Sequence, residues 1–272
     1  GTATASLAGL LKAKGHHVTG SDQDVYPPMS DELARMGVDV RSPYAEANIP
    51  QDADLVVIGN ALSRGNPEVE AVLDAKRRYT SQAALLADEF LRDRTSIVVA
   101  GTHGKTTTTS MLTHMLRHAG RDPSFLIGGV SLDLGQSYGL GRGPHFVVEG
   151  DEYDTAFFDK RPKFVHYLPD IAIIGNVEFD HADIYEDLAA VQLAFTRLMS
   201  VVPRRGLLVA GIESPALAAI LDRARSRVVT FGLEEASGAD LQARSIELSG
   251  GGASFDVVRR GTDLGRLTLS AS

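Results

Sequence analysis

The sequence predicts an α/β protein with a Rossmann-like N-terminal domain and a P-loop-type central domain, whose parallel sheet continues into a small β-meander. Three features support this prediction. Short apolar runs alternate with amphipathic segments of helical period over most of the chain, which is typical of parallel sheets covered by helices. A glycine-rich turn at residues 101–104 separates a buried strand from a helix. Residues 245–269 instead alternate around glycines, as antiparallel strands joined by short turns do.

The first domain is expected over residues 1–93, with its ligand at the carboxyl edge of its strands. Its expected elements are a helix over 6–11 that closes at Gly15, a strand over 16–20, a helix over 30–36, strands over 38–40 and 54–58, a helix starting at Asn66 and a helix over 82–91. Asn66 is a preferred N-cap residue, and Pro67 is favoured at the first helical position. Because a Rossmann-type opening begins with a strand, we expect the first strand of this domain to precede Gly1.

The second domain is expected over residues 94–272 and begins with S-I-V-V-A-G-T-H-G-K-T-T-T-T at 96–109. Residues 97–100 predict a buried strand, and Lys105 opens a helix. We place four residues on the apolar side of that helix: Met111, Leu112, Met115 and Leu116. The other expected elements are strands over 146–148, 171–174, 207–210 and 228–231, helices over 184–199 and 214–225, and the meander.

The turn after the first buried strand of this domain has the chemistry of a phosphate-binding loop. Backbone N–H groups and the positive end of the helix dipole stabilise an anion at such a turn. Lys105 adds a charge for the outer phosphates, and the hydroxyl of Thr106 can bind the accompanying Mg²⁺. The G-x4-G-K-[ST] pattern requires glycine where Val99 stands, so Gly101 begins a shorter loop. We expect an ATP or GTP site; the alternative is a strand–turn–helix without a ligand.

Two further apolar strands end in polar clusters. Residues 146–148 lead into Glu149, and residues 171–174 lead into the segment that contains His181. A carboxylate and an imidazole at the same sheet edge as Thr106 are reasonable ligands for Mg²⁺. Taken alone, the acidic cluster also fits a solvated turn, and the histidine also fits a structural residue. Together with the phosphate loop, they favour a metal–nucleotide site.

The first domain contains its own candidate, Asp22, which follows the strand predicted over 16–20. An acidic residue about twenty positions after a glycine turn contacts the ribose in dinucleotide-binding folds. The same spacing also fits a surface aspartate in a loop, and the spacing alone does not separate the two interpretations.

Composition excludes several classes of protein. The 272 residues suffice for two domains, and 43% of them are hydrophobic. A net charge of −8 argues against nucleic acid as the main partner. No apolar run approaches the length of a membrane span, so we expect no membrane association. The absence of cysteine fits a cytoplasmic protein.

The motifs G-T-H-G-K-T-T-T, E-G-D-E-Y-D and N-V-E-F-D-H stand in this order in the chain, and together they resemble the central domain of the ATP-dependent Mur ligases of peptidoglycan synthesis. Within that family, F-D-K-R-P-K-F-V-H-Y at 158–167 looks most like the branch that recycles murein peptides, as do Y-P-P-M-S at 26–30, G-N-A at 59–61 and R-G-N-P at 64–67. Some Mur ligases use a carbamylated lysine in the helix after N-x-E-x-D-H. The last lysine of this sequence, Lys163, precedes that segment, which fits the branches that add alanine or the recycled tripeptide without such a lysine.

The resemblance implies roles for individual residues. The residues that would contact ATP are Gly101, Thr102, His103, Gly104, Lys105, Thr106, Thr107 and Asn176. Those that would act in catalysis are Lys105, Glu149 and His181, and the Mg²⁺ ligands would be Thr106, Glu149 and His181. Those that would contact the UDP-sugar and its muramoyl group are Gly1, Thr2, Ser21, Asp22, Asn60, His103, Asp151, Glu152 and Tyr153.

The resemblance also implies a reaction. The lactyl carboxylate of UDP-N-acetylmuramate would attack the γ-phosphate of ATP, and the amine of L-Ala-γ-D-Glu-meso-diaminopimelate would then displace phosphate from the acyl phosphate. The alternatives are the branch that adds a single L-alanine, a non-catalytic module that binds a nucleotide sugar, and a generic P-loop kinase or ATPase. The family carries a third, C-terminal domain, which we expect to follow the sequence given.

Overall fold

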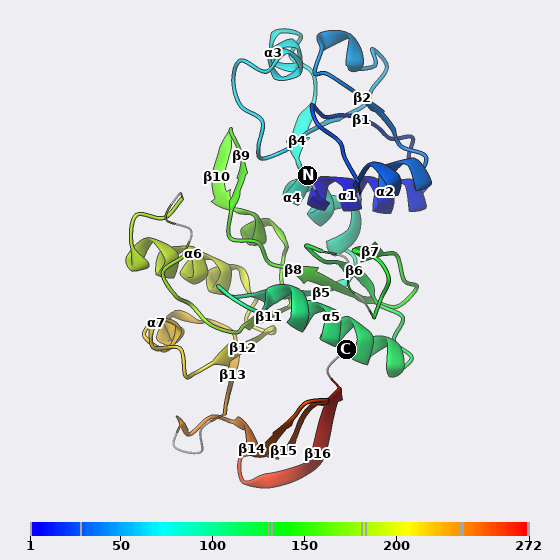
Figure 1. Cartoon of the computed structure of the whole chain (residues 1–272). Coiled ribbons are helices and arrows are strands. Elements are labelled where there is room, and N and C mark those ends of the chain that lie inside the picture. Colours follow the sequence, from blue (N-terminus) through cyan, green and yellow to red (C-terminus); the bar gives the residue numbers. More distant parts are fainter. Residues whose placement is uncertain are drawn as a thin grey trace. The chain divides into compact units, whose positions relative to one another are not determined.

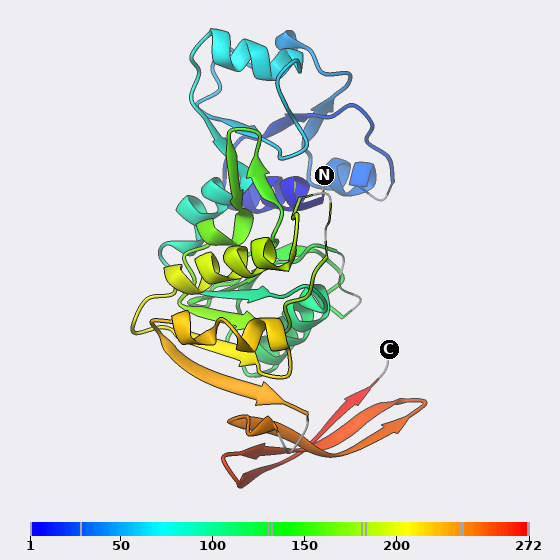
Figure 2. The ribbon, with the colours of Figure 1, turned by 90° about the vertical axis from the view of Figure 1, so that its left-hand side faces the viewer.

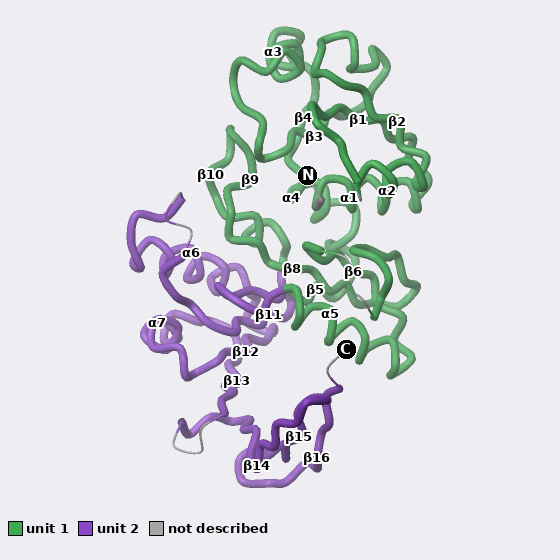
Figure 3. Tube along the Cα trace, in the orientation of Figure 1, with its two compact units in different colours: residues 1–98, 106–168 green, residues 99–105, 169–272 purple. Residues whose placement is uncertain are grey.

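The structure is a computed structural model that describes residues 2–27, 29–129, 131, 133–180, 182, 184–233 and 237–270. The chain divides into two compact units (Figure 3). Unit 1 comprises Gly1–Val98 and Thr106–Leu168, and unit 2 comprises Val99–Lys105 and Pro169–Ser272. Both contain parallel strands connected through helices, so the predicted α/β class is confirmed. No helix in the described part of the chain is long and apolar enough to cross a bilayer.

Unit 1 contains most of the helices. They are α1 (Thr2–Ala13), α2 (Met29–Arg35), α3 (Pro67–Asp74), α4 (Gln82–Leu86), α5 (Lys105–His118), the short helices η1 (Glu46–Asn48) and η3 (Lys163–His166), and the π-helix η2 (Ala87–Leu91). The first residue of α5, Lys105, belongs to unit 2. Asn66 caps α3 as predicted, because its side chain accepts from the N–H groups of Glu68 and Val69.

The strands of unit 1 belong to several sheets. They are β1 (Thr19–Ser21), β2 (Asp39–Arg41), β3 (Val56–Ile58), β4 (Tyr79–Ser81), β5 (Thr95–Ala100), β6 (Ser124–Leu126), β7 (Tyr138–Gly139), β8 (His145–Glu149), β9 (Asp154–Ala156) and β10 (Asp159–Pro162). The last two residues of β5, Val99 and Ala100, belong to unit 2. The pairs β1–β2 and β3–β4 are parallel, and the central strands follow the order β5-β8-β6-β7. Strands β6 and β8 are parallel, so their carboxyl ends lie at one edge.

The N-terminal segment packs directly on this central sheet. Helix α1 contacts β6 and β7. Gly9 allows this approach, because a Cβ atom there would lie 2.2 Å from Cζ of Tyr138. The buried hydroxyls of Ser6 and Ser137 are hydrogen-bonded at 2.9 Å. Residues that are far apart in the sequence therefore share one core.

A hairpin of β9 and β10 packs on the first part of the chain in the same way (Figures 1 and 2). Phe157, at its tip, packs against the hydrophobic cluster of Ile58, Val69 and Val72. The ring of Phe158 lies edge-on to Tyr79, with 5.1 Å between the centroids. The hairpin therefore belongs structurally with residues of the predicted first domain.

Unit 2 is a parallel sheet followed by the meander. Its strands are β11 (Ile171–Ile174), β12 (Leu207–Gly211), β13 (Arg227–Gly232), β14 (Leu241–Ser249), β15 (Gly252–Arg259) and β16 (Thr262–Ser270), and its helices are α6 (Leu188–Val201), α7 (Pro215–Ala218) and η4 (Leu221–Arg223). The strands β11 to β14 are parallel neighbours, whereas β14, β15 and β16 are antiparallel. The predicted meander is confirmed (Figure 2).

Two helices of unit 2 are shorter than the sequence predicted. Helix α6 begins at Leu188 rather than at 184, because the side chain of Asp187 accepts from the N–H of Ala190 at 2.8 Å and caps the helix there. The helix predicted over 214–225 is divided into α7 and the 3₁₀ turn η4.

The apolar side predicted for α5 is wrong in part. Met111 and Met115 are 38% and 58% exposed, whereas Thr109 and Thr113 are fully buried. The hydroxyl of Thr113 donates to the carbonyl of Thr109 at 2.8 Å, which satisfies it inside the core. A hydroxyl is costly to bury unpaired, and this bond removes that cost.

The hairpin provides a pH-dependent test of stability. Asp159 accepts from Arg161 at 2.7 and 2.9 Å, and its carboxylate lies 3.0 Å from Nε2 of His166. Hydrogen bonds from Arg161 lower the pKa of Asp159 from 3.8 to about 2. A carboxylate with a depressed pKa stabilises the fold above its unfolded-state pKa, and this stabilisation is lost as the pH falls. We expect Asp159→Asn to lower the melting temperature at pH 6.

The difference between Asp159→Asn and the wild type should shrink as the pH falls from about 4 to about 2, where the wild-type carboxylate becomes protonated. Thermal unfolding followed by circular dichroism at several pH values measures this difference, and Asp52→Asn, at an exposed position, is the control. A difference that stays constant across that pH range would contradict the assignment.

Candidate functional site

The glycine-rich loop lies in unit 2 between the end of β5 and the start of α5. Gly101 has a φ of +139° and Gly104 a φ of +79°, values that L side chains rarely adopt. A Cβ atom on Gly101 would also lie 3.2 Å from backbone atoms of Gly175 and Asn176. The loop therefore turns closely against the segment that follows β11, and glycine is required at its first position.

The same segment holds the loop through hydrogen bonds. The N–H of Thr102 donates to the carbonyl of Asn176 at 3.0 Å, and the N–H of His103 donates to the Asn176 side-chain oxygen at 2.8 Å. The Thr102 hydroxyl, which is buried, accepts from the N–H of Glu178 at 2.9 Å. Two of the residues predicted to contact ATP, Thr102 and Asn176, thus hold the shape of the loop.

Lys105 lies over the loop that it follows. Its ammonium group donates to the carbonyls of Gly101 at 2.8 Å and Thr102 at 3.1 Å. His103 is exposed, with Nε2 3.8 Å from the Glu178 carboxylate. The positive charge of Lys105 is therefore held at the mouth of the turn, where the sequence predicted phosphate.

In unit 1, Thr106 and Glu149 come together as the sequence predicted. The Thr106 hydroxyl donates to Oε1 of Glu149 at 3.0 Å, and the N–H of Gly128 donates to Oε2 at 2.8 Å. A hydroxyl and a carboxylate are oxygen donors of the kind that Mg²⁺ prefers, and Mg²⁺ is commonly bound by one or two carboxylates together with substrate phosphates. The residues present therefore fit that ion.

The acidic residues after Glu149 have other partners. Asp151 receives the Lys163 ammonium group at 2.5 Å and the N–H of Tyr153 at 2.9 Å, which joins this turn to η3. Glu152 is buried and Tyr153 is half-buried. The carboxylate of Asp151 therefore stabilises its own loop, and a substrate would have to share it with Lys163.

The candidate residues of the N-terminal part lie at the ends of its parallel strands. Ser21 is the last residue of β1, and Asp22 follows it. Asp22 accepts from the N–H of Gln23 at 2.8 Å and from the hydroxyl of Tyr44 at 3.1 Å. Burial and the neighbouring Asp22 raise the pKa of Tyr44 to about 12, so Tyr44 remains a donor. Asn60 is exposed in the turn after β3.

The remaining candidates divide into described and undescribed residues. Thr107 is exposed on the first turn of α5, and Thr2 is the first residue of α1. Gly1 and His181 lie outside the described residues. Among the residues that are described, no group of three His, Asp or Glu side chains is arranged to hold a metal ion.

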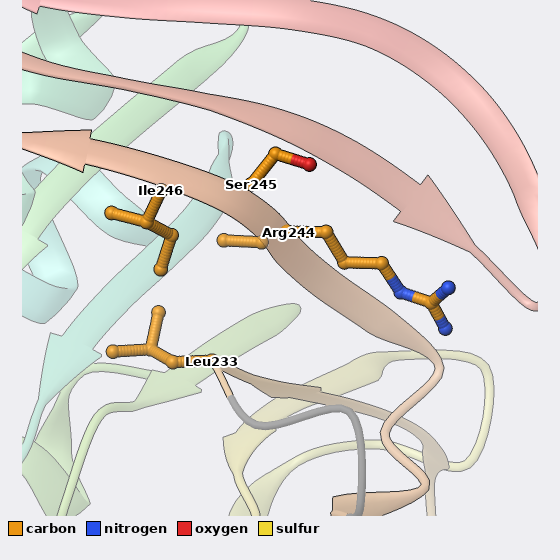
Figure 4. Close-up of a pocket in the computed structure, with 5 residues that line it drawn as sticks. Leu233, Arg244, Ser245 and Ile246 are labelled. Carbon is orange, nitrogen blue, oxygen red and sulfur yellow. The ribbon is translucent and has the colours of Figure 1, made fainter.

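Two cavities among the described residues of unit 2 lie near its strand ends. One, of about 460 Å³, lies at the carboxyl ends of β11, β12 and β13, and Asn176, Phe231 and Leu233 are among its lining residues. The other, of about 390 Å³, lies where Leu233 faces Ile246 at the bulged start of the meander (Figure 4). Of these two cavities, the first shares Asn176 and Glu178 with the contacts that hold the loop.

Comparison with known proteins agrees with this geometry. Residues 99–270 match the family model described as the Mur ligase middle domain, and residues 1–94 match the one described as the Mur ligase family, catalytic domain. The chain belongs to the Mur ligase family. Its glycine-rich loop, Thr106 and Glu149 therefore stand in the middle domain of a Mur ligase.

The curated relatives of this Mur ligase include ligases with two different described acceptors. A UDP-N-acetylmuramate–L-alanyl-γ-D-glutamyl-meso-2,6-diaminoheptandioate ligase of Haemophilus influenzae is 50% identical over 76% of the chain and 46% of the relative. A UDP-N-acetylmuramate–L-alanine ligase of Anaeromyxobacter dehalogenans is 37% identical over 99% of the chain and 56% of the relative. The chain thus spans about half the length of these curated relatives.

A solved structure is also similar. It is described as UDP-N-acetylmuramate:L-alanyl-γ-D-glutamyl-meso-diaminopimelate ligase from Neisseria meningitides, with a TM-score of 0.91 and 41% identity. The match covers 100% of this chain and 85% of that one. The fold of the Mur ligase described here is therefore close to that of a tripeptide ligase.

Sequence reasoning missed two residues of the site, Gly128 and Tyr44. Gly128 supplies an N–H to Glu149, and Tyr44 supplies a hydroxyl to Asp22. The Gly-Gly pair directly after the apolar run 125–127 was a usable signal for the first, because it follows a strand at the same edge as Glu149. No local pattern indicates Tyr44, since it lies twenty-two positions from Asp22.

Gly101 provides a test of the loop. We expect Gly101→Ala to destabilise the fold by about 1–3 kcal/mol, because alanine at this φ is strained and its Cβ would press on residues 175 and 176. Gly104→Ala is the matched control, since it has a positive φ but open space around the added atom. Chemical denaturation measures both. An equal loss for the two variants would contradict the close contact with Asn176.

Proposed function

We propose that this Mur ligase binds Mg-ATP through the loop 101–104, Lys105 and Thr106. The observation that carries this proposal is the paired arrangement of Thr106 and Glu149 at 3.0 Å, directly after a lysine held over a glycine turn. Bound Mg²⁺ would neutralise charge between the phosphates and the incoming carboxylate. In unit 2, the cavity beside Asn176 has the ring of Phe231 in its wall, which would offer an apolar surface to the base. His181 is proposed as a further metal ligand.

The proposed reaction is ATP-dependent formation of an amide bond. The lactyl carboxylate of UDP-N-acetylmuramate attacks the γ-phosphorus, the bond to ADP breaks, and an acyl phosphate forms. The amine of L-Ala-γ-D-Glu-meso-diaminopimelate then attacks the acyl carbon, phosphate leaves, and the amine loses a proton. Two anions must meet in the first step, so Lys105 and the metal site contribute mainly by positioning and charge neutralisation.

The choice of tripeptide rests on similarity. Two similar proteins are described as tripeptide ligases. They are the relative from Haemophilus influenzae, at 50% identity, and the Neisseria structure, at a TM-score of 0.91. One observation favours the second candidate, a UDP-N-acetylmuramate–L-alanine ligase: such a relative aligns over 99% of the chain, including the meander, whereas the tripeptide ligase aligns over 76%.

We assign UDP-sugar binding to a domain of residues 1–93 and ATP binding to residues 94–272. The two family matches, which meet between residues 94 and 99, support this boundary. Ser21, Asp22 and Asn60 would contact the nucleotide sugar, because they lie at or just after the carboxyl ends of parallel strands. The absence of cysteine supports a cytoplasmic location.

Substrate choice is tested by ligation with the full-length protein, ATP, Mg²⁺ and UDP-N-acetylmuramate, with either the tripeptide or L-alanine as acceptor. We expect the tripeptide to support ADP release and product formation at least about tenfold better than L-alanine. UDP-N-acetylglucosamine, which lacks the lactyl carboxylate, is the control donor and should give no product.

Equal or better turnover with L-alanine would assign the chain to the alanine-adding branch. Nucleotide-sugar binding without any ADP release would support a non-catalytic module. ADP release without UDP-N-acetylmuramate would support a generic ATPase.

Lys105→Ala tests the nucleotide site. We expect turnover to fall roughly 100-fold, because a preorganised charge at the phosphates is lost. The free energy of unfolding should change by less than about 1 kcal/mol, since Lys105 contacts loop carbonyls at a partly exposed position. Steady-state kinetics and denaturation measure the two effects. Lys160→Ala, at an exposed lysine of β10, is the matched control. Normal turnover in Lys105→Ala would contradict the assignment.

A further inference from the structure

The carboxylate of Glu149 has a backbone partner that no motif of the sequence contains. The N–H of Gly128 donates to Oε2 at 2.8 Å, while the Thr106 hydroxyl donates to Oε1 at 3.0 Å. The parallel register of β6 and β8, in which Leu126 faces Val148, brings Gly128 to this edge. Each oxygen of the carboxylate is therefore held by a separate donor in unit 1.

The two hydrogen-bond donors to Glu149 differ in conformational freedom. The Thr106 hydroxyl can rotate about its side-chain bond, and its oxygen is itself a candidate metal ligand. The Gly128 N–H belongs to the backbone two residues after β6, beside Ile127, whose own N–H donates to the carbonyl of Ser137 at 2.7 Å, so it has no side-chain rotation of its own. A neutral N–H also orients a carboxylate without cancelling its charge, which an ammonium group in the same place would do. Gly128 thus fixes Glu149 and leaves it anionic.

Only glycine allows this contact. A Cβ atom on Gly128 would lie 2.9 Å from Oε1 and 3.1 Å from Cδ and Oε2 of Glu149, so the carboxylate would have to move. The three nearest atoms to that Cβ all belong to the Glu149 carboxylate, which is the far end of a flexible side chain. An alanine here would therefore press first on Glu149. At the adjacent Gly129, the nearest contact of an added Cβ is Cγ2 of Thr106 at 3.9 Å, an ordinary van der Waals distance.

We propose that Gly128 is a positioning residue of the metal site: its backbone N–H, and the absence of a side chain, hold the Glu149 carboxylate where a divalent cation is bound. This inference rests on the proposed function, because it concerns the same cation. It adds a determinant that lies outside the three motifs and acts only through Glu149.

The test compares Gly128→Ala with Gly129→Ala in the full-length protein, with Mn²⁺ as the probe. Binding of Mn²⁺ in the presence of ADP is followed by electron paramagnetic resonance, which needs no turnover. We expect Gly128→Ala to raise the dissociation constant of Mn²⁺ about tenfold, in the range typical when a group that orients a metal ligand is lost. Gly129→Ala should bind Mn²⁺ as the wild type does, and both variants should keep the wild-type melting temperature.

Repeating the substitution in a variant that already lacks the Glu149 carboxylate distinguishes positioning of Glu149 from a general effect on the loop. In Glu149→Gln, which weakens the metal site itself, adding Gly128→Ala should change Mn²⁺ affinity by less than about twofold, because the two changes act through one side chain. Equal Mn²⁺ affinities for Gly128→Ala and Gly129→Ala would overturn the proposal and leave the proposed function intact. Absence of Mn²⁺ binding by the wild type with ADP would overturn both.

Discussion

The backbone of residues 101–104 keeps its shape because it is hydrogen-bonded to residues 175–178, and the rest of the site in unit 2 depends on this contact. A turn with two glycines at positive φ has little stability of its own, since unfolded glycine is unusually free. Asn176 supplies both a carbonyl and a side-chain oxygen to it. The N–H groups of Thr102 and His103 are used in these bonds, so an anion would be met by the groups further along, at the start of α5.

The carboxylates of Glu149 and Asp151, near the end of β8, have different hydrogen-bond partners. Glu149 faces Thr106 and Gly128, both of which leave its charge uncompensated. Asp151, two residues later, is compensated by Lys163, whose side chain is almost fully buried. A buried ammonium group needs a partner, so Asp151 is committed to holding the turn. The two carboxylates of this cluster therefore have different partners, uncharged donors for Glu149 and a buried ammonium group for Asp151.

Several elements were predictable because their signals are local. The Asn66 cap, the strand that ends at Ala100 and the helix that begins at Lys105 each depend on neighbouring residues, and all three are present. The buried face of α5 was not predictable in the same way. Hydropathy placed Met115 inside, yet the core accepts Thr113, because a hydroxyl that bonds to its own helix can be buried at little cost. Similarly, the hairpin of β9 and β10 was not predicted from the sequence, and only the fold brings Phe157, at its tip, to the cluster around Val69.

The sequence by itself determined the α/β class, the longer elements in their order, the glycine-rich loop with Lys105 and Thr106, and the candidacy of Glu149. These follow from periodicity, capping and spacing, which act over a few residues. The short strands β4, β6, β7, β9 and β10 had no expected counterpart. The tertiary structure decided which groups hold them: Asn176 on the loop, Gly128 on Glu149 and Tyr44 on Asp22. Each of these pairs joins segments separated by 21 to 73 positions. Such contacts are set by strand register and helix packing, because parallel strands bring distant carboxyl ends to one edge.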